Sequence, residues 1–259
     1  MKCTAVHCFN ARPLEQPSLL MPKFSVVTVC YNESSLIAET CESIVSQKYK
    51  NFEWIVIDGG STDGTLQVLK EYEGSIDCLV SEQDSGIYNA MNKGAALATG
   101  DYLIFMNGGD SFANADVLDV VAECPSGDII VGQLEFASES DVRTFPLQLP
   151  AGYLLRHMLP HQATFFHRAI FERFGYFDES FIIAGDYEFF VRIIVKNKAS
   201  YHYIPKVLAV FSGGGISSSF HQRAIRKSEN HRVRWKYFIR YRFSLKAWRQ
   251  QFRDFSLKD

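Results

Sequence analysis

Four short apolar segments in the first half of the chain each run into a polar turn. They span residues 24–30, 52–57, 78–80 and 102–106. Nearly uninterrupted apolar runs rich in β-branched residues are typical of strands buried on both faces of a sheet. Helical spacing follows the first three of them. This alternation of strand and helix predicts an α/β fold with a parallel sheet and right-handed crossovers.

Each of these segments ends in polar or acidic side chains. Asn32, Asp58, Asp84 and Asp110 follow the four segments in order. Ligands of open α/β sheets bind at the carboxyl ends of the strands, so we expect these residues to line one rim. A lone acid at a strand end is usually a turn or helix-cap residue, and that alternative is open for Asp110. Four successive polar ends favour a binding site.

The glycine-rich signatures of two common nucleotide-binding folds are missing. No G-x-G-x-x-G follows residues 24–30, and the chain has no G-x-x-x-x-G-K-[ST] loop. If a nucleotide binds, its phosphates must be held by the acids and a metal ion rather than by a glycine-rich helix start. Asp110 offers the oxygen ligand that a hard divalent cation needs.

Composition and patterning point to the cytoplasm. The six cysteines are scattered without a C-x-x-C pair, as expected of buried thiols in a reducing compartment. No apolar run approaches the roughly 18 residues that a membrane span needs. Residues 1–20 do not have the layout of a signal peptide. We expect a cytoplasmic protein that could be peripheral on the inner face of the membrane.

Charge is distributed unevenly along the chain. The formal net charge is −2, yet residues 221–259 hold 12 Lys and Arg against 3 Asp and Glu. Aromatic side chains lie among these cations, and helical spacing puts Trp235 and Phe238 near one face. Such a basic helical tail suits an anionic membrane surface. A helix packed on the core and RNA binding are the alternatives; we favour the membrane and expect no nucleic acid.

Six motifs follow one another along the chain. They are Val-Val-Thr-Val-Cys-Tyr-Asn-Glu (26–33), Ile-Asp-Gly-Gly-Ser-Thr-Asp-Gly-Thr (57–65), Asp-Ser-Gly-Ile-Tyr-Asn-Ala-Met-Asn-Lys-Gly (84–94), Met-Asn-Gly-Gly-Asp (106–110), His-Gln-Ala-Thr-Phe-Phe (161–166) and Gly-Asp-Tyr-Glu (185–188). In this order they resemble the family-two glycosyltransferases of GT-A fold. The resemblance implies a Rossmann-like, mixed but mainly parallel sheet flanked by helices. It also implies inverting transfer of a sugar from a nucleotide diphosphate to a hydroxyl group.

The resemblance also divides the chain. Residues 1–21 are expected to form a loosely ordered extension, and residues 22–220 the GT-A domain. Within this domain, residues 22–112 would be the nucleotide-binding half and residues 113–220 the acceptor half. The basic aromatic helical tail, residues 221–259, follows.

Matching positions imply roles on the donor side. Tyr31, Asn32 and Asp58 correspond to positions that hold the base and ribose. Asp84 and Lys93 correspond to donor-site positions, and the Lys93 ammonium could offset diphosphate charge. The predicted donor-binding residues are Thr28, Tyr31, Asn32, Glu33, Asp58, Asp84, Lys93, Asn107 and Gly109.

The remaining roles concern the metal, the base and the acceptor. Asp110 matches the acid that contacts Mn²⁺ or Mg²⁺. Asp186 matches the general base, with a helix N-cap as the alternative. His161, Gln162 and Glu188 are expected at the acceptor, although a lone histidine such as His161 is more often a structural hydrogen-bonding residue.

The chain departs from the family pattern at three places. Gly59 stands where many members have a second Asp, which puts the base contact in doubt. Asn107 and Gly109 replace other acids of the D-x-D region, so diphosphate and water would supply most metal ligands. Gly185 stands where a Glu commonly precedes the base.

One base and one metal ion predict a single displacement with inversion. The expected donor is a nucleotide sugar, most plausibly a UDP-sugar. The expected acceptor is a saccharide or a lipid-linked molecule in surface polysaccharide or glycolipid synthesis. A sugar nucleotidyltransferase and a non-catalytic nucleotide-sugar-binding protein are the rival interpretations.

Overall fold

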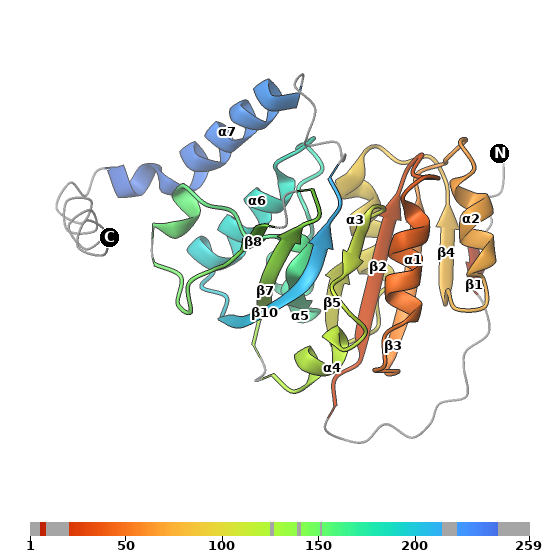
Figure 1. The fold of residues 1–259 in the computed structure, drawn as a ribbon. Helices are drawn as coiled ribbons and strands as arrows, with labels where there is room; N and C mark the ends of the chain where they lie inside the picture. Colours follow the sequence, from red (N-terminus) through yellow and green to blue (C-terminus); the bar gives the residue numbers. More distant parts are fainter. Residues whose placement is uncertain are drawn as a thin grey trace.

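A computed structural model of the chain describes residues 6–8, 21–124, 127–138, 141–150, 152–213 and 222–242. Most of the predicted N-terminal extension and the end of the basic tail lie outside this part. Figure 1 shows the described elements along one continuous sheet.

Strands and helices alternate through the first half of the chain, as predicted. The elements are β2 (Phe24–Cys30), α1 (Ile37–Val45), β3 (Phe52–Asp58), α2 (Thr65–Glu71), β4 (Cys78–Ser81), α3 (Ile87–Leu97) and β5 (Tyr102–Phe105). β2 pairs in parallel with both β3 and β5, and β3 pairs in parallel with β4. The carboxyl ends of these strands therefore share one edge of the sheet.

The second half is less regular. Its elements are β6 (Asp110–Phe112), α4 (Val117–Ala122), β7 (Ile129–Phe136), β8 (Asp141–Arg143), the 3₁₀ helices η1 (Tyr153–Leu155) and η2 (His161–Ala163), β9 (Thr164–His167), α5 (Ala169–Phe174), α6 (Gly185–Phe190), the π-helix η3 (Val191–Lys196), β10 (Tyr201–Phe211) and α7 (Gln222–Arg242). η3 follows α6 directly and continues it with π-helical geometry.

The two halves share a mixed sheet. The strand order is β1-β4-β3-β2-β5-β9-β7-β10-β6, with β8 attached to β7. β9 pairs antiparallel with β5 on one side and with β7 on the other, and so joins the halves. β1 (Val6–Cys8), which lies in the predicted loose extension, pairs antiparallel with β4. The predicted mixed α/β sheet is confirmed, and the extension adds a short strand to it. The sheet is parallel from β4 through β3 and β2 to β5 and between β7 and β10, whereas β1, β6, β8 and β9 pair antiparallel with their neighbours, so the described sheet is less parallel than predicted.

Asp110 opens a strand and does not cap a helix. It is the first residue of β6, and it lies opposite Phe211 of the antiparallel strand β10. The next helix, α4, begins several residues later with Asp116 at its N-cap position. The helix-cap alternative for Asp110 is therefore wrong.

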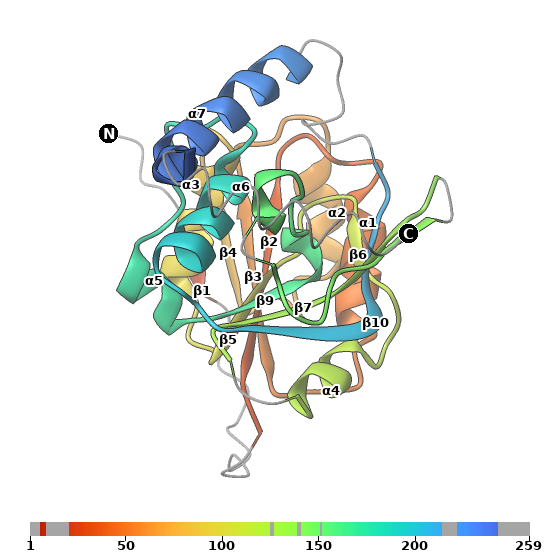
Figure 2. The same ribbon diagram turned by 90° about the vertical axis from the view of Figure 1, so that its left-hand side faces the viewer.

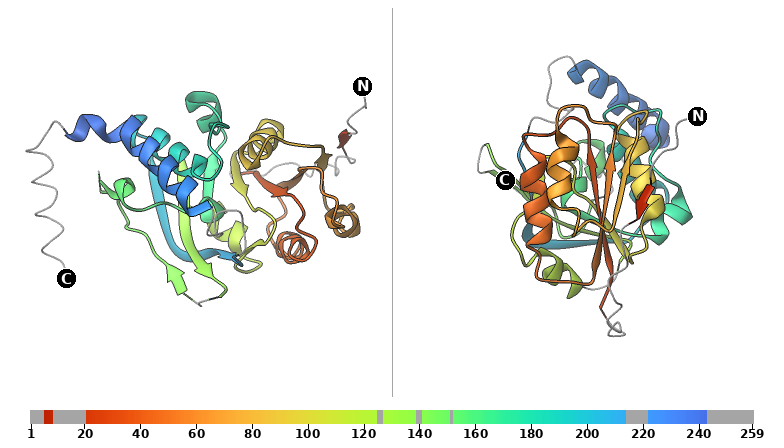
Figure 3. Two further views of the ribbon diagram at one scale, coloured as in Figure 1. Left: turned by 90° about the horizontal axis from the view of Figure 1, so that it is seen from above. Right: turned by 90° about the vertical axis from the view of Figure 1, so that its right-hand side faces the viewer.

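Helices cover both faces of the sheet. The core on one face contains buried residues of α1, α2 and α4, and the core on the other contains those of α3, α5, α6 and α7. The turned views in Figures 2 and 3 show these two layers. α1 buries Ile37, Cys41 and Ile44, which helical periodicity places on one stripe. Its N-cap residue is Leu36, which has no side chain that could cap the helix.

The basic tail forms the long helix α7, whose inner face packs on the domain. Val233 and Phe238 are buried, whereas Trp235 is 60% exposed. Trp235 follows Val233 by two residues, which is about 200° around a helix, so it faces outward. Trp235 and Phe238, predicted near one face, differ in burial, because Phe238 packs on the domain and Trp235 does not. Within the described residues, no helix is long and apolar enough to cross a membrane.

Candidate active site

A chain of hydrogen bonds crosses between the two halves of the molecule. Asn107, just after β5, places its Nδ2 atom 3.1 Å from Nε2 of His161 in η2. Nδ1 of His161 lies 3.2 Å from Oδ2 of Asp186, at the start of α6. With the proton on Nδ1, His161 accepts from the amide and donates to the carboxylate. Three of the predicted site residues therefore meet.

Asp186 is a buried carboxylate, 6% exposed, with two further polar neighbours. Its Oδ1 atom accepts the backbone N–H of Tyr187 at 2.8 Å and lies 3.3 Å from the Tyr88 hydroxyl. The N-cap position of α6 belongs to Ala184, so Asp186 is not the N-cap residue. The alternative interpretation of Asp186 as a cap is not supported.

Tyr88 explains why a glycine precedes Asp186. Its hydroxyl donates to the Ile183 carbonyl at 2.6 Å, and its ring packs against Gly185. A Cβ atom at position 185 would lie 2.7 Å from that ring, which is closer than real contacts allow. Burial, followed by the charge of Asp186, raises the pKa of Tyr88, so the hydroxyl stays a donor. Sequence analysis assigns Tyr88 no role, because only the fold brings α3 to α6.

Asp110 is 4% exposed and has an unusually high pKa. Burial raises this pKa to about 7, although the charge of His161 and hydrogen bonds from Gln162 and the Asn107 backbone oppose the shift. Gln162 thus contacts the predicted metal ligand, and the structure shows no acceptor role for it. A buried carboxylate of this kind would be stabilised in its charged form by a cation.

Thr40 of α1 fixes the loop that carries Asp110. Its hydroxyl donates to the Asp110 carbonyl at 2.7 Å and accepts the Gly109 N–H at 3.0 Å. The Gly109 amide is therefore already hydrogen-bonded within the loop. Sequence reasoning missed Thr40; a fully buried threonine in a helix is a weak signal that appears only once burial is known.

The residues around Asp110 fit a hard divalent cation in part. Oδ1 of Asn107 is buried and has no hydrogen-bond partner, and it belongs to the same loop as the Asp110 carboxylate. Carboxylate and amide oxygens are ligands that Mg²⁺ and Mn²⁺ accept. Among the described residues, no cluster of three or more His, Cys, Asp or Glu could hold a metal by itself. The chain would therefore supply a minority of the ligands.

The carboxyl ends of β2, β3 and β4 bring three predicted or motif residues together. The Tyr31 ring and the Asp84 carboxylate both lie next to Gly59. Tyr31 is 59% exposed, which leaves its ring available for stacking. A Cβ atom at position 59 would lie 2.5 Å from Oδ2 of Asp84 and 3.3 Å from the Tyr31 ring. The glycine in place of the family's second Asp thus makes room for the Asp84 carboxylate.

Two of the predicted donor-binding residues lie beneath the rim. Asp58 is fully buried, and its carboxylate accepts N–H groups of Gly60 and Ser61 and the Ser81 hydroxyl. Thr28 is also fully buried and accepts the indole N–H of Trp54 at 2.9 Å. Both side chains shape the strand ends from below, and neither is placed to touch a ligand.

Asn32 and Glu33 connect the first two strand ends. Oδ1 of Asn32 accepts the Thr62 N–H at 2.9 Å, and the residue has a left-handed φ of 54°. The Glu33 backbone N–H donates to the Thr65 hydroxyl at 2.8 Å. Burial, and then the charge of Asp63, raise the pKa of Glu33. These contacts organise the loops around the predicted donor site.

Lys93 is paired in this structure. Its Nζ atom lies 2.8 Å from Oε1 of Glu82, and both side chains are partly exposed. An anionic donor would have to compete with Glu82 for this ammonium group.

Glu188, predicted at the acceptor, lies among side chains of η3 and α7 in the structure. Its carboxylate is buried and lies 3.1 Å from Nε of Arg192 and 3.2 Å from Nζ of Lys236. The Tyr237 hydroxyl donates to the same group. Glu188 is two residues from Asp186, which places it on another side of α6, toward α7.

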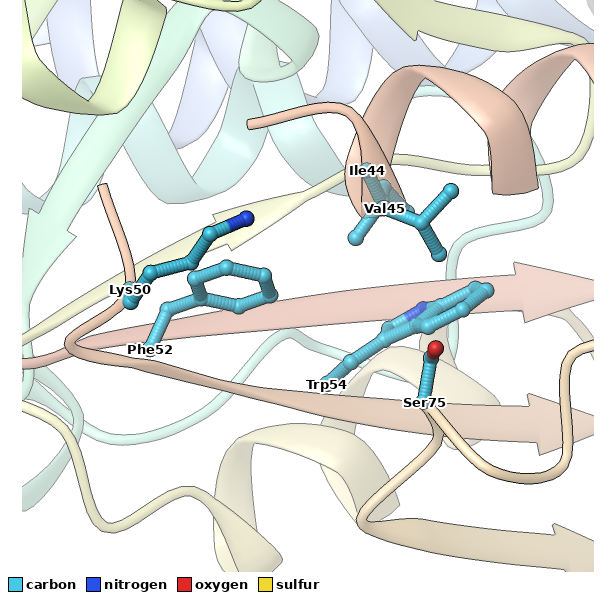
Figure 4. A pocket seen from close by; sticks show the side chains of 6 residues that line it. All are labelled: Ile44, Val45, Lys50, Phe52, Trp54 and Ser75. Carbon is cyan, nitrogen blue, oxygen red and sulfur yellow. The ribbon is translucent and has the colours of Figure 1, made fainter. Parts of the chain in front are cut away.

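A small hollow lies away from this site. It is lined by Ile44, Val45, Lys50, Phe52, Trp54 and Ser75 (Figure 4). Phe52 is the first residue of β3, so the hollow lies at the amino end of the strand whose carboxyl end carries Asp58. It belongs to the opposite edge of the sheet.

Sequence comparison identifies the family to which the chain belongs. Residues 25–187 match the sequence pattern of glycosyl transferase family 2, and the match ends just after Asp186. The chain belongs to glycosyl transferase family 2. An uncharacterised glycosyltransferase of Mycobacterium tuberculosis is 36% identical over 179 residues, which cover 66% of this chain and 68% of the relative. A PGL/p-HBAD biosynthesis glycosyltransferase of Mycobacterium bovis is 29% identical over 206 residues, covering 76% and 80%.

Solved structures share the fold at lower identity. TarS of S. aureus (residues 1–349) in complex with UDP-GlcNAc has a TM-score of 0.66 at 21% identity, covering 76% of this chain and 61% of that one. The mannosyltransferase PcManGT of Pyrobaculum calidifontis, in complex with GDP-Man and Mn²⁺, has a TM-score of 0.64 at 21% identity, covering 86% and 65%. The chain thus spans roughly three fifths of the length of these two solved chains.

Proposed function

We propose that this family-2 chain is an inverting, divalent-metal-dependent glycosyltransferase that moves a sugar from a nucleotide diphosphate to a hydroxyl acceptor. The observation that carries the proposal is the hydrogen-bonded chain from Asn107 through His161 to Asp186. It joins the loop of one buried carboxylate, Asp110, to a second one, Asp186. A single displacement of this kind requires one carboxylate that binds the metal ion and a second that accepts the proton of the acceptor hydroxyl.

Asp186 is the proposed general base. The acceptor hydroxyl attacks C1 of the sugar and gives its proton to the Asp186 carboxylate, while the bond from C1 to the diphosphate oxygen breaks. The electron pair of that bond leaves with the nucleotide. His161 and the Tyr187 N–H hold the carboxylate in place during this step. Attack opposite the leaving group inverts the anomeric carbon.

Asp110 and Asn107 are the proposed protein ligands of Mn²⁺ or Mg²⁺. The bound ion would neutralise charge that develops on the leaving diphosphate. Support comes from the burial of Asp110 and from the unpartnered Oδ1 of Asn107. PcManGT, which shares the fold, was solved with Mn²⁺.

A UDP-sugar is the proposed donor. Tyr31 could stack on the base, and the Asp84 carboxylate lies beside it at the same strand ends. TarS, of similar fold, was solved with UDP-GlcNAc. Lys93 would reach the donor only by giving up Glu82. The proposed acceptor is a saccharide or lipid-linked molecule in surface polysaccharide or glycolipid synthesis, in line with the name of the M. bovis relative.

We also propose that α7 binds an anionic membrane surface at its cytoplasmic side. Glu229 is the one acid between residues 222 and 242, and it faces inward with 8% exposure. Exposed positions of α7 hold Trp235 and six cations, which are Arg223, Arg226, Lys227, Arg232, Arg234 and Lys236. Of these, Lys236 also pairs with Glu188, and Arg232 contacts Ser180 and Phe181. In Figure 1, α7 lies along the outside of the molecule. A cationic face with an aromatic side chain suits the interface of anionic lipids.

The donor proposal is tested by incubating the protein with UDP-, GDP- and dTDP-sugars plus Mn²⁺ and assaying the products. Free nucleoside diphosphate supports a glycosyltransferase, and EDTA should stop its release. Pyrophosphate release would instead indicate a nucleotidyltransferase. Binding of a nucleotide sugar without turnover, even with saccharide and polyprenyl-phosphate acceptors, would indicate a non-catalytic binding protein.

The membrane proposal is tested by flotation of the full chain with phosphatidylglycerol vesicles and with phosphatidylcholine vesicles. Flotation with the anionic vesicles alone is expected. The variant Lys227→Glu/Trp235→Ala, altered only on the outer face, should float less. Deletion of the tail is unsuitable, since it would also remove buried Val233 and Glu229. Equal flotation of both proteins would refute the proposal.

A further inference from the structure

A side chain of α7 binds the backbone of residues 182–184, which lie just before Asp186. The backbone N–H groups of Ile182, Ile183 and Ala184 donate to the carboxylate of Glu229 at 2.7, 2.9 and 2.8 Å. Ala184 is the residue before α6, and Asp186 is the second residue of that helix. One side chain, more than forty positions later in the chain, therefore satisfies three consecutive amides next to the proposed base.

Ala184 is the N-cap residue of α6. The first N–H groups of a helix have no partner inside it, and Ala184 has no side chain that could cap α6. Ile182 and Ile183 precede the helix, and their N–H groups share the Glu229 acceptor with that of Ala184. Hydrogen bonds from N–H groups to an ionised carboxylate are shorter and stronger than neutral ones. The negative charge also lies at the positive end of the helix dipole. Glu229 thus does from a distance what a capping side chain does locally.

Residues 182–184 also accept a hydrogen bond from α3. The Ile183 N–H goes to Glu229, whereas the Ile183 carbonyl accepts from Tyr88 of α3. Tyr88 belongs to the nucleotide-binding half and Glu229 to the tail. Residue 183 is therefore fixed through both of its peptide groups, three positions before Asp186.

We propose that Glu229 is a positioning residue that sets the place of the Asp186 carboxylate, so that α7 is part of the catalytic apparatus. This inference rests on the proposed role of Asp186 as the base. Glu229 itself touches no substrate; it acts through the backbone that carries Asp186. The packed Val233 and Phe238, in the following turns, hold Glu229 against this segment.

The test uses Glu229→Gln, which keeps the side-chain volume but leaves one oxygen to accept three N–H groups. We expect kcat for nucleotide release, measured with the sugar nucleotide that gives turnover, to fall roughly 10- to 100-fold, the range expected of a slightly displaced catalytic group. KM for the donor should change less than about 2-fold, because the donor-side residues are untouched. Amide hydrogen exchange across residues 182–184 should become faster.

Two further variants separate positioning from general destabilisation. Ser228→Ala changes an exposed neighbour on α7 and should leave kcat and exchange unchanged. Glu229→Asp keeps the charge with a shorter reach and should recover part of kcat. In an Asp186→Asn background, Glu229→Gln should add little further loss of kcat, because both changes act through one group.

Three results would overturn the inference. The first is an unchanged kcat in Glu229→Gln, and the second is unchanged amide exchange at residues 182–184. The third is a kcat in the double variant with Asp186→Asn that falls by the product of the two single losses. If Asp186→Asn itself turns over normally, the proposed function fails instead. If Glu229→Gln does not fold, Glu229→Asp carries the same test, and normal kcat with normal exchange in that variant rejects the inference.

Discussion

The carboxylates of the nucleotide-side rim and the carboxylate at α6 are held in different ways. Asp58 and Asp63 accept hydrogen bonds largely from their own loop, from N–H groups two or three residues later. Asp186 depends on His161 and Tyr88, and its backbone depends on Glu229. The rim carboxylates are therefore held by their own loops together with contacts from neighbouring strand ends, whereas the proposed base has remote partners from α3, η2 and α7 around its side chain and the backbone before it. Four changes would break or sharpen this contrast.

The largest effect is expected at the base. Asp186→Asn should lower nucleotide-sugar turnover by roughly 10²-fold or more, because the amide cannot take the acceptor's proton. Binding of UDP, measured by calorimetry, should stay the same, because the substitution leaves the residues of the rim unaltered. Normal turnover in this variant would remove Asp186 from its proposed role.

The next effect is expected at the proposed metal ligand. Asp110→Asn should lower Mn²⁺-dependent turnover by at least roughly 10-fold and raise the Mn²⁺ concentration needed for half-maximal activity. Asp141→Asn, at an exposed position in β8, is the matched control and should behave as the unmodified protein. Turnover that persists in excess EDTA would contradict the metal assignment.

A smaller effect is expected within the rim. Gly59→Ala would place a Cβ atom 2.5 Å from the Asp84 carboxylate, so that carboxylate must move. We expect the Kd for UDP to rise roughly 3- to 10-fold, about 1 kcal/mol. Calorimetry on Gly59→Ala/Asp84→Ala is the matching experiment. If Asp84 does not bind the nucleotide, the double variant should bind as the unmodified protein does.

The smallest effect concerns stability against pH. Hydrogen bonds from the Thr65 hydroxyl and the Ser34 N–H lower the pKa of Asp63 below its usual range. A carboxyl group with a lowered folded pKa stabilises the fold above its unfolded pKa of about 4, and this contribution is lost as pH falls further. The melting temperature of the protein should therefore exceed that of Asp63→Asn at pH 7, and the gap should close in acid. A gap that is constant with pH would contradict the assignment.

Much of the rim could be predicted from sequence. The apolar runs and polar strand ends placed Asn32, Asp58, Asp84 and Asp110 in order, because each motif lies within one loop. Whether a given side chain is exposed at the rim or buried beneath it could not be predicted. Thr28 and Asp58 lie in the right segments but are fully buried, since neighbouring strands supply their partners.

The acceptor half was harder to predict. Glu188 was assigned to the acceptor from its place in a motif, yet its carboxylate meets Arg192 and Lys236. Thr40 and Glu229 gave no signal, because a helix pattern does not show which remote backbone groups a polar side chain will meet. A helix in the tail was predicted. Which of its side chains are buried could not be predicted, because this depends on the surface of the domain that the helix covers.

The sequence by itself determined the strand-helix alternation, the family and the candidate carboxylates, because periodicity, turns and motifs are short-range properties. Only the tertiary structure decided that Asn107, His161 and Asp186 form one chain, that Tyr88 requires Gly185, and that α7 caps the segment before Asp186. These contacts join residues tens of positions apart. They arise because β9 joins the two halves into one sheet, so that helices from both halves and from the tail pack on the same face.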